Sequence, residues 1–134
     1  MTGIITSRLV PLHERASFLP NHAGKHFLRY ESLTYCLMEQ ACDAYSGGLW
    51  NFHTLSNGGF FIAPDMEGTL QISWIDNYYD GEMSAEAAGI GISLMVQSQM
   101  AFITNEPRFS EAFHALREYA LDHTEAGQIF RFID

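Results

Sequence analysis

The stretch that decides the fold is GGLWNFHTLSNGGFFIAP, residues 47–64. It sets two Gly pairs around a run of aromatic and β-compatible residues and contains no Lys, Arg, Asp or Glu. Asn57-Gly58 is a strong hairpin signal, because a type I′ turn needs positive φ at both central residues and these residue types adopt it at little cost. The pattern predicts strands over residues 49–55 and 60–63 that pair as an antiparallel hairpin, with Leu55 opposite Phe60.

The predicted register assigns the side chains of the hairpin to two faces. One face carries Trp50, Phe52, Phe61 and Ala63, and the other carries Leu49, Asn51, His53, Phe60 and Ile62. Further along the chain, Pro64 ends the second strand, and TLQISW, residues 69–74, alternates apolar and polar residues. We expect this third strand to continue the hairpin as an antiparallel meander, with room for a fourth strand.

Apolar residues at helical spacing predict two long helices around these strands. The first runs over about residues 28–44 and stops at the first Gly pair. The second runs over about residues 85–103, begins after the capping residue Ser84, and is apolar nearly all round. Gly89 and Gly91 lie within it, and each is less favourable in a helix than Ala, so we expect them to let the backbone approach the sheet.

Shorter helices are expected toward both ends of the chain. Residues 12–19 allow two helical turns at most, an amphipathic helix follows Pro107 to about residue 122, and a short helix is favoured over 125–134. No repeat or linker divides the sequence. The predicted fold class is α+β: a single domain over residues 1–134, with an antiparallel meander of three or four strands packed against about three to four helices.

The charges are unevenly distributed along the chain. Seven Lys and Arg stand against sixteen Asp and Glu, a formal net charge of −9, and no Lys or Arg lies between Arg29 and Arg108. Clustered cations are needed to bind nucleic-acid phosphates, so direct nucleic-acid binding by this interval is not expected. The acids of the interval form either a solvated surface or a face for a basic partner.

Other features of the sequence indicate where the protein works. No apolar run approaches the roughly 18 residues that span a bilayer, and the N-terminal segment lacks the pattern of a signal peptide. Cys36 and Cys42 lie six residues apart on different faces of a predicted helix, so free thiols are expected. We expect a cytoplasmic protein that is not bound to a membrane.

Residues that often bind metals are present without a recognisable metal site. His22 and His26 have the spacing of a metal-binding pair, but a proline and a glycine interrupt the helix that would align them. Asp76, Asp80 and Glu82 cluster in a predicted loop and do not follow the order of an EF-hand. We predict no metal and no cofactor.

Catalytic constellations are not apparent either. His53 lies in a predicted strand near Ser56, yet the sequence has no G-x-S-x-G motif, and Cys36 has no neighbouring cation that would activate a thiol. We therefore predict no catalytic residues and no enzymatic activity. The alternative is a small hydrolase or ligand-binding domain that uses His53 on the sheet face.

Several motifs of the chain form one recognisable set. They are RASFLP (15–20), Glu31, Tyr35, Tyr45, GGLWNF (47–52), LSNGGFFIAP (55–64), SAEAAGI (84–90) and Ile133-Asp134. In their order and rough spacing these motifs resemble the KlcA/ArdB antirestriction family of plasmids and other mobile elements. They cover almost the whole chain. The resemblance implies a protein that protects incoming DNA from host type I restriction-modification enzymes.

The resemblance also implies a partner, which we expect to be the type I restriction-modification complex or an associated host protein. The predicted contact residues are Asn51, Asn57, Phe61, Asp76, Asp80, Glu82 and Asp134. Mimicry of DNA by the acidic interval and specific protein contact are both open mechanisms. We favour specific contact, because −9 is a modest charge for imitating a polyanion and the acids lack a regular spacing.

Overall fold

The central hairpin forms as β2 (Trp50–Leu55) and β3 (Phe60–Pro64) in a computed structural model, which describes residues 4–134. A short N-terminal strand, β1 (Ser7–Leu9), pairs with the other side of β2, so the sheet has the order β1-β2-β3 and is antiparallel throughout. The sequence pattern therefore predicted the hairpin correctly and missed β1, which is too short to show alternation.

The register of the hairpin differs from the prediction by one residue. Thr54, and not Leu55, lies opposite Phe60. The N–H of Gly58 donates to the carbonyl of Leu55 (3.0 Å), and the N–H of Leu55 donates to the carbonyl of Gly59 (2.8 Å). The loop thus has three residues and ends on Gly58 with a φ of 90°, the usual form of a hairpin loop one residue longer than type I′.

This shift of one residue changes which side chains share a face. His53 lies opposite Phe61, and Asn51 lies opposite Ala63, so these four side chains are on one face. The other face carries Trp50, Phe52, Thr54, Phe60 and Ile62. The prediction that Phe61 shares a face with Phe52 is therefore wrong.

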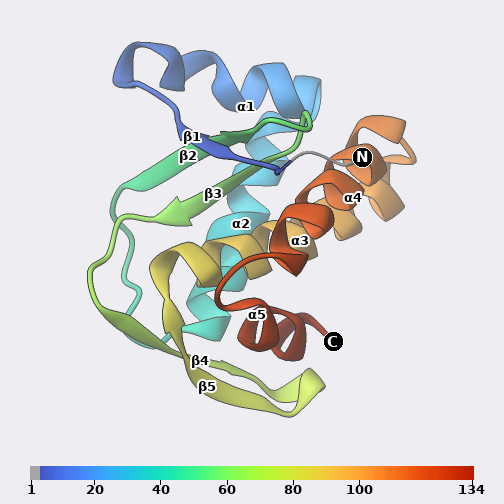
Figure 1. The fold of residues 1–134 in the computed structure, drawn as a ribbon. Helices are drawn as coiled ribbons and strands as arrows, with labels where there is room; N and C mark the ends of the chain where they lie inside the picture. Colours follow the sequence, from blue (N-terminus) through green and yellow to red (C-terminus); the bar gives the residue numbers. More distant parts are fainter. Residues whose placement is uncertain (1–3) are drawn as a thin grey trace.

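The third predicted strand belongs to a second sheet. β4 (Thr69–Trp74) pairs antiparallel with β5 (Tyr79–Ser84) and not with β3. Figure 1 shows this β4–β5 hairpin beneath α5 (Ala126–Ile133) and apart from the first sheet. The α+β class is confirmed, whereas the continuous meander is replaced by two antiparallel sheets.

The outer edge of β3 explains why β4 does not pair there. Helix α3 (Ala85–Thr104) lies along that edge, and Ser93 Oγ both accepts from the N–H of Ile62 and donates to its carbonyl, at 3.2 Å each. Gln97 Nε2 donates to the carbonyl of Phe60 (3.1 Å). Side chains of a helix thus satisfy the backbone groups that a further strand would otherwise bind.

Helix α3 is the centre of the core. Ser84 Oγ accepts from the N–H of Ala87 (3.1 Å), which confirms the predicted cap. By length and hydropathy α3 resembles a membrane span, but most of it is buried against β3 and other helices, as expected of a core helix. Gly89 contacts Ala63 of β3 as predicted, whereas Gly91 faces Phe132 of α5 and not the sheet.

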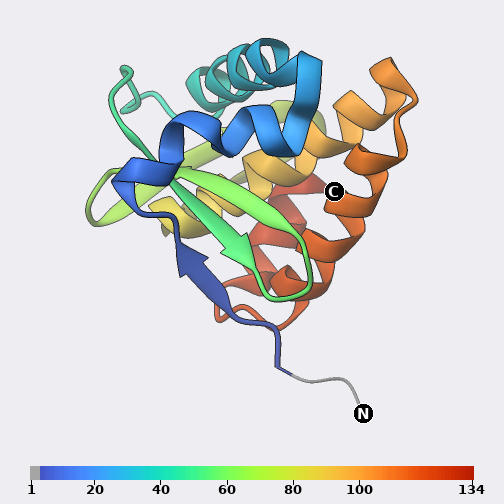
Figure 2. The same cartoon turned by 90° about the horizontal axis from the view of Figure 1, so that it is seen from above.

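The other helices surround α3 and the first sheet. They are α1 (Arg15–Ala23), α2 (Phe27–Ala41) and α4 (Pro107–Leu121), together with α5. Figure 2 shows α1 crossing over the β2–β3 hairpin, while α3 and α4 pack against β3. The predicted tail helix is confirmed as α5, and α1 continues through Pro20 for longer than the sequence indicated.

Candidate partner-contact site

Two predicted contact residues on the central hairpin hold parts of the fold together. Asn57 Nδ2 donates to the carbonyl of Ala115 in α4 (2.8 Å), and its Oδ1 accepts from the N–H of Gly59 (3.1 Å). Asn51 Oδ1 accepts from Nη2 of Arg15 (3.1 Å). Asn57 is exposed and Asn51 is half-buried, so Asn57 is the more accessible of the two.

Phe61, the third predicted contact residue on this hairpin, is not on the surface. Its side chain is 0% exposed and is stacked between His53, with ring centroids 4.5 Å apart, and Tyr119 of α4, at 6.1 Å. The prediction of surface contact by Phe61 is wrong, because all five residues of β3 are buried and α4 covers the face that carries Phe61.

His53 packs against the ring of Phe61, and the two rings are nearly parallel. Burial lowers the pKa of His53 below its ordinary value, so the ring is held neutral. Its Nδ1 is buried without a hydrogen-bond partner. Within residues 4–134, no hydrogen bond joins any histidine ring to a hydroxyl or a thiol, the pairing that would activate a nucleophile.

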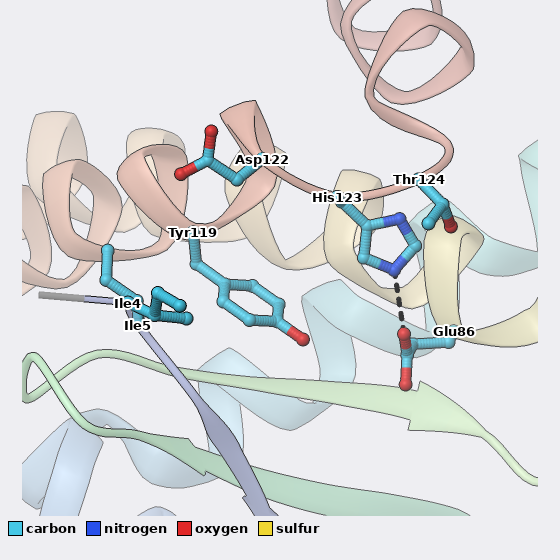
Figure 3. A pocket seen from close by; sticks show the side chains of 7 residues that line it. All are labelled: Ile4, Ile5, Glu86, Tyr119, Asp122, His123 and Thr124. Carbon is cyan, nitrogen blue, oxygen red and sulfur yellow. Dashed lines mark hydrogen bonds and ion pairs between the residues drawn. The ribbon is translucent and has the colours of Figure 1, made fainter.

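A pocket of about 620 Å³ lies beside α4 and the start of α3, and no motif of the sequence indicates it. His123 and Glu86 point toward each other there, with Nε2 and Oε2 2.7 Å apart, and the Tyr119 ring lies next to them (Figure 3). The hydrogen bond from His123 lowers the pKa of Glu86, against the effect of its partial burial. The two residues are 37 positions apart, so no local motif could reveal the pair.

The two histidines with metal-like spacing have different neighbours. His26 Nε2 lies 2.7 Å from Oε2 of Glu106, just before α4. His22 packs between the rings of Phe18 and Phe60, and burial lowers its pKa. Among the residues that the structure describes, no group of three or more His, Cys, Asp or Glu is placed to hold a metal ion.

The predicted acidic residues Asp80 and Glu82 lie on the outer face of the β4–β5 hairpin. Asp80 Oδ1 accepts from Nε2 of Gln71 (2.6 Å) and from Oγ of Ser73 (2.9 Å), both across the strand pair. Asp76 is in the 3₁₀ turn that joins the strands, and all three carboxylates are exposed. Asp80 and Glu82 on the outer face of β5, together with Asp76 in the turn, are called here the acidic ribbon, and the inner face of the hairpin packs on the core.

Asp134 is exposed beside the same hairpin. It lines two hollows, of about 370 Å³ and about 480 Å³, and Asn77 of the hairpin lines both of them as well. The structure thus brings four predicted residues into one region, the β4–β5 hairpin with the end of α5. Asn51 and Asn57 lie elsewhere, on the first sheet.

Comparison with known proteins gives consistent results. The profile of a family described as "Antirestriction protein" matches residues 43–134. The antirestriction protein KlcA of Escherichia coli is 38% identical over 97% of this chain and 95% of its own. The protein YfjX of Escherichia coli K12 is 40% identical over 93% of this chain and 85% of its own.

A solved structure supports the same grouping at the level of the fold. The solved structure comes from a study of the KlcA and ArdB proteins, which are described as having a novel fold and as active against type I DNA restriction systems in vivo but not in vitro. It matches this structure with a TM-score of 0.90 and 37% identity, and the match covers 100% of this chain and 98% of that chain. The chain belongs to the antirestriction protein family.

Proposed function

We propose that this protein protects incoming plasmid or mobile-element DNA from host type I restriction-modification enzymes. The observation that carries the proposal is the similarity to KlcA over nearly the full length of both chains. The related structure is described as active in vivo but not in vitro, which favours a mechanism that depends on other cellular components. The partner is therefore the type I complex or a host protein associated with it, and the protein acts in the cytoplasm.

The proposed mechanism is protein contact without an enzymatic step. The three histidines His26, His53 and His123 face carboxylates or aromatic rings and are not paired with a nucleophile. The interval from β2 through α3 contains no Lys or Arg, so its surface would repel the phosphates of nucleic acid and attract a basic protein.

The test is the plating efficiency of unmodified phage on a host with an active type I system, with and without this protein. We expect a large rise that is confined to the restricting host, with a restriction-free strain as control. Absence of any rise, with folded protein present and more than one type I family tested, would contradict the proposal.

The alternative function, a small hydrolase or ligand-binding domain using His53, has one supporting observation. His53 lies near enough to Glu86 for the carboxylate to oppose the lowering of the His53 pKa by burial, and Glu86 lines the pocket of about 620 Å³. If a folded His53→Ala variant keeps full protection of phage, the histidine site is not used for this activity.

A further inference from the structure

The turn of the β4–β5 hairpin exposes two large apolar side chains. Ile75 is 86% exposed and Tyr78 is 97% exposed, and both lie in the four-residue segment 75–78, called here the hairpin end. Single exposed apolar residues are common on protein surfaces, whereas two on one short turn form a concentrated apolar projection.

The fold gives no reason for a tyrosine at position 78. Its backbone is left-handed, with a φ of 51° and a ψ of 35°, a conformation that is unfavourable for most L-residues and that glycine or asparagine adopts more easily. Because the ring is almost fully exposed, no packing within the chain offsets that cost.

The hairpin end is held firmly on α5. Asn77 Nδ2 donates to the carbonyl of Phe132 (2.7 Å), and the rings of Trp74 and Tyr79 lie 6.0 Å and 5.7 Å from the Phe132 ring. The hydroxyl of Tyr79 also donates to Oε1 of Gln128 (2.6 Å). A projection that is already ordered loses little conformational entropy when it enters a partner.

The surroundings of the hairpin end have the shape and charge of a contact surface. The two hollows that share Asn77 lie next to the projection and offer concave surface to a partner. The exposed carboxylates of this region are Asp76, Asp80, Glu82 and Asp134. Within residues 4–134, the cation that lines one of these hollows is Arg131, whose guanidinium lies 6.0 Å from the centre of the Tyr79 ring. Carboxylates therefore outnumber cations around the apolar projection.

We propose that the hairpin end anchors this protein to a protein partner, with Tyr78 and Ile75 entering an apolar pocket whose rim carries Lys and Arg. Tyrosine is frequent among the few residues that carry most of the binding energy of an interface, and a basic rim complements the acidic ribbon. A second copy of this chain is a poorer occupant, because it would bring two acidic ribbons together. This inference rests on the proposed function only for the identity of the partner.

The first experiment compares variants in the phage plating assay. The double variant Ile75→Ser, Tyr78→Gly should lower protection by about tenfold or more, as expected when an aromatic anchor is removed. Its melting temperature should stay the same or rise, because glycine suits the left-handed backbone. Phe102→Ser is the control, since Phe102 is 91% exposed but lies near the end of α3. Full protection by the double variant would overturn the proposal.

The second experiment does not depend on antirestriction. A photo-crosslinking benzoylphenylalanine is placed at position 78, or at position 102 as control, and the cells are irradiated. We expect a discrete adduct from position 78 whose cross-linked peptide belongs to another protein and contains Lys or Arg. The adduct should disappear when Asp76→Lys and Glu82→Lys are added. Equal adducts from both positions, adducts only with this chain, or no effect of charge reversal would each overturn the proposal.

The two experiments separate this inference from the proposed function. A charge-dependent adduct at position 78, in a protein that does not protect phage, would remove the proposed function and leave the contact standing. If the double variant still protects phage, and benzoylphenylalanine at position 78 gives no charge-dependent adduct, the contact is overturned and the proposed function is left standing.

Discussion

Gly89 is the residue at which the core helix comes nearest to the first sheet. A Cβ atom at this position would lie 2.5 Å from Cα of Ala63 and 2.7 Å from the carbonyl oxygen of Ile62, both backbone atoms that cannot move aside cheaply. We predict that Gly89→Ala lowers the free energy of unfolding by about 1–3 kcal/mol, as overpacking usually does, although Ala is the better helix former. Urea unfolding followed by circular dichroism measures the change.

Gly127 provides the matched control. It also lies in a helix, α5, but a Cβ atom there would meet nothing within 4 Å. Gly127→Ala should therefore raise the free energy of unfolding, by up to about 1 kcal/mol. If the two substitutions changed stability in the same direction, close packing at Gly89 would not explain the glycine.

At the scale of an element, α3 acts in place of a strand at the edge of β3. Ser93→Ala would leave the N–H and carbonyl of Ile62 buried without their present partner. We predict a loss of about 1–3 kcal/mol in the free energy of unfolding, the usual cost of unpaired buried polar groups. Ser98→Ala on the exposed side of the same helix should change stability by less than about 0.5 kcal/mol. Equal effects of both substitutions would argue against an edge role for Ser93.

The contacts at this edge of β3 could not be predicted from the sequence, whereas most of the helices and strands could. The helices and the central hairpin followed from apolar periodicity and from Asn57-Gly58, because both signals are local. The pairing of β4 could not be predicted in this way, because it depends on α3 occupying the edge of β3. Ser93 and Gln97 look like ordinary polar residues of a helix, and their hydrogen-bond partners in β3 are 31 and 37 positions away. The predicted register of the hairpin is wrong by one residue, because the residues around Asn57-Gly58 fit a loop of two residues as well as a loop of three.

At the scale of the whole molecule, two His–Glu pairs fasten the ends of α4 to the rest of the fold. His26 pairs with Glu106 near its start, and His123 pairs with Glu86 just beyond its end. The first pair ties α4 to the segment between α1 and α2, and the second ties it to the start of α3. The position of α4, which covers Phe61, therefore depends on both pairs.

The Glu86 pair makes stability depend on pH. The folded protein lowers the pKa of Glu86 below its ordinary value of 4.5, so the folded carboxyl binds a proton less readily than the unfolded one. The contribution of the Glu86 carboxylate to the free energy of unfolding is present above about pH 4.5, and it is lost as the pH falls through the lower pKa of the folded protein. Because Glu86 is nearly half exposed, we expect about 1 kcal/mol or less.

Urea unfolding at pH 7, pH 4 and pH 3 measures this contribution. Glu86→Gln should be less stable than the parent at pH 7, and the difference should shrink as the pH falls. Glu82→Gln is the control, because Glu82 is exposed and has no ion-pair partner within residues 4–134. A constant difference between Glu86→Gln and the parent at all three pH values would contradict the assignment.

The candidate site was predicted in part at this scale. The absence of Lys and Arg from the middle of the chain pointed to Asp76, Asp80 and Glu82. In the structure Asp80 and Glu82 are exposed on the outer face of β5, and Asp76 lines one hollow together with Asp134. Phe61 was expected to be exposed near the tip of the hairpin, but α4 packs over it, and no local sequence pattern indicates that contact. Tyr78 has a left-handed backbone between the 3₁₀ turn and β5, and no local sequence signal predicts that conformation for a tyrosine.

The contact between α3 and β3 also bears on how the protein behaves at high concentration. An open strand edge can accept a strand from another molecule and begin a growing fibril. On the β3 side such growth would require the main core helix to leave, which means unfolding the protein. On the opposite side β1 offers three residues, one of them the charged Arg8, a poor template for strand addition. Resistance of the first sheet to strand addition is thus a by-product of how the core is closed.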